Sequence, residues 1–187
     1  MDESSIGDGA ARWARALPVL YVDDDRSSLA LFARAFEKRF RIITASSVDE
    51  ALRIIEREPV AVLVTDHQMP GMIGTALCAE VARRFPRVRR VILTGYSNER
   101  LLVDAINSGA AHHFLTKPWR RFEVHQVLMN CLAVARAERE ARQLRQAAME
   151  RERAETLALT RRCVLHDLAG MTSGLGMSCY LLRARLL

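Results

Sequence analysis

The 187-residue sequence contains no long apolar run and no closely paired cysteines. No stretch approaches the roughly eighteen consecutive apolar residues typical of a membrane-spanning helix. Residues 1–16 also lack the apolar centre of a secretory signal. The four cysteines are far apart in the chain and form no CxxC motif, so we interpret them as buried free thiols. These absences argue against a membrane protein and predict a cytoplasmic one.

Proline and glycine are missing from a long part of the second half of the chain. No proline follows Pro118, and no glycine occurs between Gly109 and Gly170. Between Arg121 and about Leu168 the sequence is rich in alanine, arginine, glutamate and leucine, which are strong helix formers. The chain therefore divides into a mixed first part and a second part that we predict to be one long helix.

Lysine is scarce, and charges of the two signs are interspersed. Only two of the 28 basic residues are lysines, and one of them, Lys117, stands before a proline at the end of an apolar run. The formal net charge is +6, but basic and acidic residues are not gathered in blocks. We therefore expect no nucleic-acid partner. Half of the residues are apolar, which is enough to form a substantial core.

Before residue 121, apolar runs of strand length alternate with amphipathic segments of helix length. This alternation predicts an α/β fold with a parallel sheet covered by helices on both faces. The run Val60–Val64 is apolar throughout, as in a central parallel strand, and Ser47 with Glu50 forms a capping box before a helix. The predicted strands are 17–22, 41–45, 60–65, 90–94 and 112–115, and the predicted helices are 26–39, 47–57, 75–85 and 97–108.

A polar residue follows or ends most of these predicted strands. Asp23 and Asp24 follow the first, Asp66 the third, Thr94 ends the fourth, and Lys117 comes after the fifth. Because ligands bind at the carboxyl ends of parallel strands, we expect these side chains to meet at one edge. Three neighbouring carboxylates repel one another unless a cation neutralises them, and hard oxygen ligands suit Mg²⁺. With a lysine and a hydroxyl nearby, the set suits phosphoryl transfer onto Asp66.

Other interpretations of these carboxylates are open. A carboxylate after a strand often caps the next helix, and we assign that role to Asp25. A phosphatase-type enzyme with Asp66 as nucleophile would need a second acid, for which His67 and Asp25 are the nearby candidates. A transcription factor with a DNA-binding helical arm would show steep salt dependence, but the sequence has no helix-turn-helix pattern. No GxxxxGKS loop occurs, so we expect no complete ATP-dependent enzyme here.

Four segments together resemble the receiver domain of two-component response regulators. They are Val19–Asp25, Val62–Gly71, Val91–Gly95 and His113–Trp119, and the resemblance covers residues 17 to about 125. It implies a five-stranded, parallel, doubly wound (flavodoxin-like) sheet, to which the predicted long C-terminal helix is added as an extension.

The resemblance also implies a role for each matching residue. Asp66 would accept the phosphoryl group, and Mg²⁺ would be bound by Asp23, Asp24, Asp66 and the backbone carbonyl of Gln68. Thr94 and Lys117 would contact the phosphoryl group, Lys117 before a cis Pro118. Phe114 would be the aromatic residue that changes rotamer on activation. Ile73 departs from the family pattern, in which an aspartate is common at that position.

The middle of the long helix is highly charged. Arg136–Arg162 carries thirteen charged residues and only a thin, heptad-like apolar stripe of Ala137, Ala141, Leu144 and Ala148. Because so polar a helix is unstable alone, we predict a parallel homodimer with a coiled-coil seam. A solvated helical arm is the alternative.

Near the end of the chain, the segment that begins at His166 and Asp167 resembles the phosphoacceptor box of histidine-kinase dimerisation helices. The resemblance implies that His166 is a second phosphoacceptor and Asp167 its base. The segment departs from that family at Met171, where a proline is usual, and at Gly170, where threonine or asparagine supports phosphatase activity. The expected organisation is a tail (1–16), a receiver domain (17–121) and a helical dimerisation segment with this box (122–187).

The sequence thus predicts a Mg²⁺-dependent receiver in a two-component phosphorelay. Asp66 would take its phosphoryl group from the phosphohistidine of a histidine kinase or phosphotransfer protein and switch the helical output or dimer. The alternative is the N-terminal receiver and partial dimerisation region of a hybrid histidine kinase.

Overall fold

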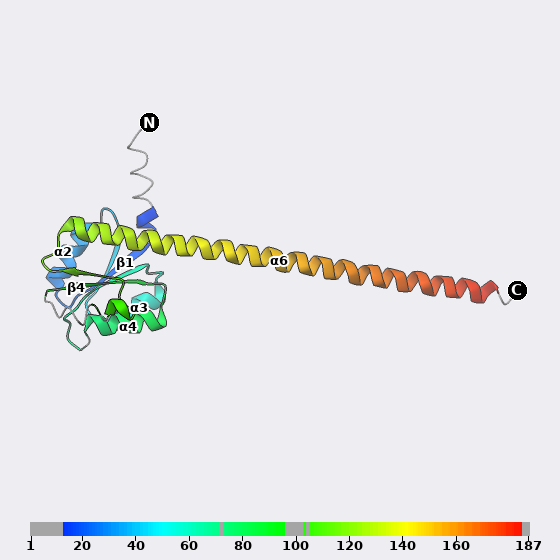
Figure 1. Ribbon diagram of the computed structural model, residues 1–187, viewed down its shortest axis with the longest axis horizontal. Helices are drawn as coiled ribbons and strands as arrows, with labels where there is room; N and C mark the ends of the chain where they lie inside the picture. The colour runs from blue at the N-terminus through cyan, green and yellow to red at the C-terminus, as the bar shows by residue number, and fades with distance from the viewer. Residues whose placement is uncertain (1–12, 72, 96–102, 104, 185–187) are drawn as a thin grey trace, which may run out of the picture. The chain divides into compact units, whose positions relative to one another are not determined.

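The computed structural model describes residues 13–71, 73–95, 103 and 105–184, with side chains described up to residue 161. Helical residues at 103 and 105–107 fall within the predicted helix 97–108, of which residues 97–102 and 104 lie outside the described part. The elements are β1 (Pro18–Val22), α2 (Arg26–Phe36), β2 (Arg41–Ala45), α3 (Val48–Arg57), β3 (Val62–Asp66), α4 (Gly74–Arg84), β4 (Arg89–Thr94), β5 (His113–Thr116) and α6 (Arg121–Ala184) (Figure 1).

The strands form one five-stranded sheet in the order β2-β1-β3-β4-β5. Every neighbouring pair is parallel, which confirms the predicted fold class. Helices α3 and α4 cover one face, and α2 with the first turns of α6 covers the other (Figure 1). The chain passes from β1 to β2 on one side and then returns to β3 on the other, so the connections diverge between β1 and β3.

Strand residues alternate between two apolar cores. In β1, Val19 and Tyr21 pack into the core beneath α2 and α6, whereas Leu20 and Val22 pack toward α3 and α4. The period of two in a strand causes this division, and it explains why the central strands are apolar at nearly every position.

Side chains cap the first two long helices. The Asp25 carboxylate accepts hydrogen bonds from the backbone N–H groups of Ser27 and Ser28, each at 3.0 Å, as the predicted N-cap. Ser47 accepts from the Glu50 N–H at 3.3 Å. The Glu50 carboxylate reaches the N–H of Ser46 at 2.8 Å, one residue earlier than the reciprocal capping box requires.

Helix α6 changes its environment along its length. Val124, Leu128 and Leu132 are spaced by four residues, so they lie on one face and are buried in the core. Two compact units divide at Glu138 and Arg139. The helix continues past the predicted end near Leu168 and through Gly170, because a glycine costs a helix only about 1 kcal/mol relative to alanine and no proline follows. Within the part of the chain that the structure describes, no helix has the length and apolarity needed to cross a bilayer.

A buried arginine organises the connection into β5. Arg90 is 4% exposed, and its guanidinium donates to the carbonyls of Val88 (2.6 Å), Gly109 (3.0 Å) and Ala110 (2.6 Å). The backbone N–H of Arg90 donates to Nδ1 of His112 at 3.0 Å. Burial, reinforced by the charges of Arg90 and Arg89, lowers the pKa of His112 to about 4. His112 is therefore neutral in the folded protein near neutral pH.

We predict that His112 makes stability depend on pH. Its pKa is about 4 when folded, but near 6.5 in an unfolded chain. Between these values the unfolded state binds a proton that the folded state does not, so the free energy of unfolding should fall as the pH decreases from 6.5 to 4. Urea unfolding at pH 7 and pH 4.5 should show a smaller decrease for His112→Gln than for the wild type. Equal decreases would mean that other groups cause the pH dependence.

Candidate functional site

The alternation within the strands places charged groups on one face at the edge of the sheet. Asp23 lies two residues after Tyr21, and Asp66 lies two residues after Val64. Tyr21 and Val64 belong to the core that packs against α2 and α6. Side chains two apart in extended backbone point the same way. Lys117 follows β5 at the same edge, and its ammonium reaches both carboxylates.

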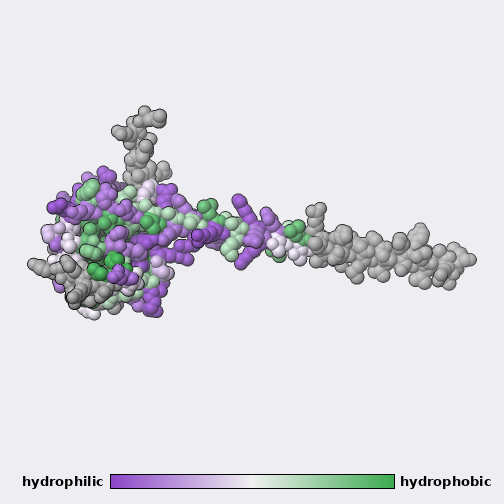
Figure 2. Space-filling model, viewed as in Figure 1, coloured by the Kyte–Doolittle hydropathy of each residue, from purple (hydrophilic) through white to green (hydrophobic). Residues whose placement is uncertain are grey.

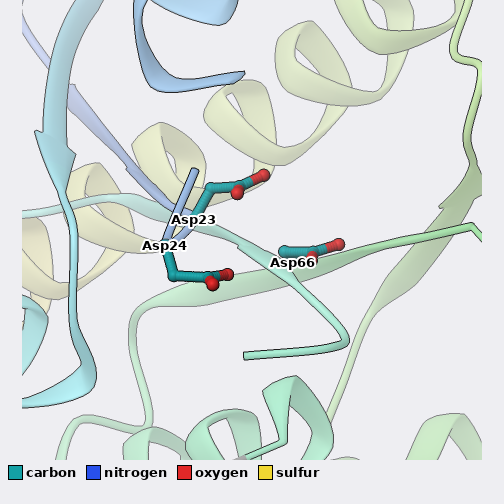
Figure 3. A group of neighbouring side chains, drawn as sticks. All are labelled: Asp23, Asp24 and Asp66. Atoms are coloured by element: carbon teal, nitrogen blue, oxygen red, sulfur yellow. The ribbon is translucent and has the colours of Figure 1, made fainter. Parts of the chain in front are cut away.

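Three carboxylates meet where the strand connections diverge, between β1 and β3. Oxygen atoms of Asp23, Asp24 and Asp66 lie within 4.8 Å of one another (Figure 3). Asp23 is 2% exposed and Asp66 9% exposed, whereas Asp24 is open to solvent. Crevices at such a divergence are where ligands bind in open α/β sheets.

Lys117 bridges two of the carboxylates. Its Nζ lies 2.9 Å from Oδ1 of Asp66 and 3.0 Å from Oδ2 of Asp23. Burial lowers the pKa of Lys117, but its hydrogen bonds to Asp66 and Asp23 outweigh this effect, so its pKa lies above the ordinary value. The backbone N–H of Lys117 donates to the Thr94 carbonyl at 2.6 Å, and the Lys117–Pro118 peptide bond is cis. The lysine is therefore a permanent positive charge at the site.

Tyr21 is a site residue that the sequence motifs did not indicate. Its hydroxyl donates to Oδ2 of Asp23 at 2.6 Å, and the side chain is buried. Burial raises the pKa of Tyr21 well above its ordinary value, as does the hydrogen bond to Asp23, so the hydroxyl keeps its proton. The available signal was the spacing of two residues from Asp23 together with the need of a buried tyrosine hydroxyl for a partner.

The geometry agrees with the comparisons to known proteins. The family model "Response regulator receiver domain" matches residues 19–129, more than half of the chain. The chain belongs to the response regulator receiver family. Receiver domains of this family are parts of two-component response regulators.

Several relatives are transcriptional regulators. Hydrogenase transcriptional regulatory protein HoxA of Cupriavidus necator is 35% identical over 101 residues, which are 54% of this chain and 21% of that protein. Transcriptional regulatory protein GlrR of Escherichia coli K12 is 33% identical over 115 residues, 61% of this chain and 26% of that protein. The chain thus spans only about a quarter of the length of these relatives.

Solved structures show the same fold. An uncharacterized protein from Neptuniibacter caesariensis has a TM-score of 0.64 and 31% identity, covering 67% of this chain and 94% of that one. The signal receiver domain of an HD domain-containing protein from Pseudomonas fluorescens Pf-5 has a TM-score of 0.62 and 26% identity, covering 66% and 92%.

The other residues to which the sequence assigned a role differ in burial and in position along the chain. Thr94 is buried at the end of β4, the strand that pairs with both β3 and β5. Phe114 in β5 is 45% exposed, so it is not a core aromatic residue. Gln68 is exposed two residues after Asp66. His166 and Asp167 lie in α6 beyond residue 161, outside the residues whose side chains the structure describes.

The donor set of the receiver fits Mg²⁺. The three carboxylates supply hard oxygen ligands, and the exposure of Asp24 leaves one side open to water and phosphate. Mg²⁺ prefers such oxygen ligands and retains several waters. Lys117 contributes one positive charge against three negative ones, so the site as a whole favours a divalent cation.

A hollow elsewhere on the receiver does not involve these groups. It has a volume of about 570 Å³ and lies between α2 and the start of α6. It is lined by Ala35, Phe36, Arg39, Arg121, Phe122, His125 and Gln126. None of the three clustered carboxylates lines this hollow.

Gly74 allows the loop after β3 to fold closely onto Asp66. A Cβ at Gly74 would lie 2.2 Å from the Asp66 carbonyl oxygen and 3.0 Å from the Cα of His67. The Gly74 N–H donates to the His67 carbonyl at 2.8 Å. A side chain at position 74 would therefore displace the backbone that carries the Asp66 carboxylate.

We predict that Gly74→Ala lowers the free energy of unfolding by about 1–3 kcal/mol, because the methyl group must push against backbone atoms. Gly95→Ala is the matched control, since a Cβ there would meet no atom of the described residues within 4 Å. Urea unfolding should show a clear loss for the first variant and a change below about 0.5 kcal/mol for the second. Equal stability of Gly74→Ala and the wild type would contradict the close approach.

Proposed function

We propose that this chain is a Mg²⁺-dependent phosphoacceptor switch of the cytoplasm, with Asp66 as the phosphorylated residue. The donor would be the phosphohistidine of a histidine kinase or phosphotransfer protein. The observation that carries this proposal is the placement of Asp66 beside Asp23 and Asp24, with Lys117 2.9 Å from its carboxylate.

In the proposed reaction, a carboxylate oxygen of Asp66 attacks the phosphorus atom. A P–O bond forms, the P–N bond to the donor histidine breaks, and its electron pair stays on the imidazole nitrogen. Mg²⁺, when bound, offsets the negative charge of the phosphoryl oxygens. Lys117 moves from the Asp66 carboxylate to a phosphoryl oxygen, and the Thr94 hydroxyl donates to another. The new dianion thus replaces Asp66 as the main partner of the lysine.

The switch follows from the position of Thr94 between two strands. Thr94 ends β4, and Phe114 lies on β5, which pairs with β4. A phosphoryl group on Asp66 would draw Thr94 toward it and open space beside β5. Phe114, which is 45% exposed, would turn into that space and change the adjacent surface. The charge on Asp66 would in this way alter a partner-binding surface.

Asp66→Asn should abolish labelling by radioactive phosphoramidate in the presence of Mg²⁺, because the amide is not a nucleophile of comparable strength. Asp25→Asn is a matched control, since Asp25 caps α2 and is exposed. The wild type and the control should both carry an alkali-labile acyl phosphate. Undiminished labelling of Asp66→Asn would contradict the assignment.

In the hybrid-kinase alternative, His166 is a second phosphoacceptor. With a phosphohistidine donor protein, a second label that is stable in alkali and labile in acid, and is lost in His166→Ala, would identify a relay. Whether or not His166 is phosphorylated, we propose that Asp66 accepts a phosphoryl group, because the carboxylate site does not include His166.

We also propose that the segment of α6 beyond Glu138 forms a parallel homodimeric coiled coil. Its described side chains, up to residue 161, are mostly hydrophilic with separate hydrophobic patches (Figure 2). Leu144, the only leucine of the predicted stripe, is 73% exposed within the single chain. A helix in which leucines are uncovered and charges dominate gains stability by burying its apolar stripe against a second copy. We expect no nucleic acid at this segment, because acidic residues are interspersed among its arginines.

Leu144→Glu should weaken self-association at least tenfold, because it places a charge in the seam. Gln143→Glu adds the same charge one position away from the stripe and should have little effect. Sedimentation equilibrium of both variants and the wild type gives the dissociation constants. A monomeric wild type at 100 μM would contradict the dimer and favour the solvated helical arm.

A further inference from the structure

The carboxylate of Asp23 is held by donors from three directions. Oδ2 accepts from the Tyr21 hydroxyl at 2.6 Å and from Lys117 Nζ at 3.0 Å, and Oδ1 accepts from the Asp25 N–H at 3.0 Å. A carboxylate has about four acceptor positions. Oδ2 is therefore fully used by the protein, and the remaining acceptor position belongs to Oδ1.

The tyrosine hydroxyl is fixed by the packing of its ring. Tyr21 is 1% exposed and stacks on Phe32, with ring centroids 4.1 Å apart and an interplanar angle of 20°. Phe32 in turn contacts Trp119 edge to face, with a centroid distance of 6.0 Å. The ring lies in a large buried cluster of which Phe32 is only one member, so the phenol oxygen keeps its place when that single neighbour is replaced by another apolar side chain.

The two donors to Oδ2 differ in mobility. Lys117 is shared between Asp23 and Asp66, and a flexible four-carbon chain carries its charge. In the proposed reaction Lys117 leaves for the phosphoryl group. Oδ2 of Asp23, which is buried, would then have no donor if the tyrosine hydroxyl were missing. An unpaired buried charged group is costly, so the hydroxyl is the donor that serves both states.

We propose that Tyr21 is a positioning residue: its hydroxyl holds Oδ2 of Asp23 so that Oδ1 is presented to the cation and Lys117 is free to serve Asp66. The hydroxyl also limits the pull of Asp23 on the lysine. Without it, the Lys117–Asp23 ion pair tightens and competes with the cation for the same carboxylate. This inference rests on the proposed function, because it assumes that the carboxylate cluster binds Mg²⁺.

Tyr21→Phe removes the hydroxyl and keeps the ring on Phe32. Calorimetric titration with Mg²⁺ alone, without any phosphodonor, should give a dissociation constant about tenfold weaker than that of the wild type, as expected for the loss of one charge-assisted hydrogen bond. Matching circular dichroism spectra of the two proteins at the titration temperature show that both are folded.

Two further variants separate positioning from packing. Phe32→Leu removes the ring neighbour but leaves the hydroxyl, so it should lower the unfolding midpoint and leave the Mg²⁺ dissociation constant within twofold. In an Asp23→Asn background, Tyr21→Phe should cause no additional loss of affinity, because the tyrosine acts through that carboxylate.

The outcomes are distinct. An unchanged Mg²⁺ affinity in Tyr21→Phe would overturn the positioning role while leaving the receiver function intact. An equal loss of affinity in Phe32→Leu would assign the effect to packing and would also overturn it. A wild type that binds no Mg²⁺ at millimolar concentrations would overturn the cation site itself, and the role of Tyr21 with it.

Discussion

The charge balance between Lys117 and the carboxylates of Asp23 and Asp66 is the constraint on which the site depends. Asp23 and Asp66 are nearly buried, and a carboxylate oxygen of Asp24 lies within 4.8 Å of an oxygen of each. Like charges this close raise the free energy of the folded state unless cations offset them. The lysine supplies a positive charge that reaches both buried groups from β5, so the site is only partly neutralised by the protein. This excess of negative charge favours the binding of a divalent cation.

The fold supplies this arrangement through simple geometry. Parallel pairing brings the ends of β1, β3 and β5 to one edge, and the two-residue period of the strands turns Asp23 and Asp66 to the face of α2 and α6. Tyr21 lies on the same face, where it stacks on Phe32 and donates its hydroxyl hydrogen bond to Asp23. Local order at the site is therefore a property of the hydrophobic core as much as of the charged residues.

Much of the receiver unit could be predicted because its signals are local. The span of β2 agrees with the predicted strand, and the bounds of β1 and α3 differ from prediction by one residue. Contacts that depend on the conformation of loops were harder to predict. Glu50 bonds to Ser46, and α4 begins at Gly74, where the closeness of the Asp66 carbonyl excludes a side chain. Such details depend on how the loops close, which no residue pattern specifies.

The sequence by itself determined the five strands, the alternation with helices, and the acidic and basic residues that follow the strand ends. Apolar periodicity and the positions of strand ends are local features of the sequence, so they can be identified without knowing which residues are neighbours in space. Only the tertiary structure decided that the Tyr21 hydroxyl meets Asp23, that Lys117 is shared between Asp23 and Asp66, and that α6 stays in the core as far as Leu132. Each of these contacts depends on the exact distance between side chains whose positions are set by packing in three dimensions, and that distance is absent from a linear pattern.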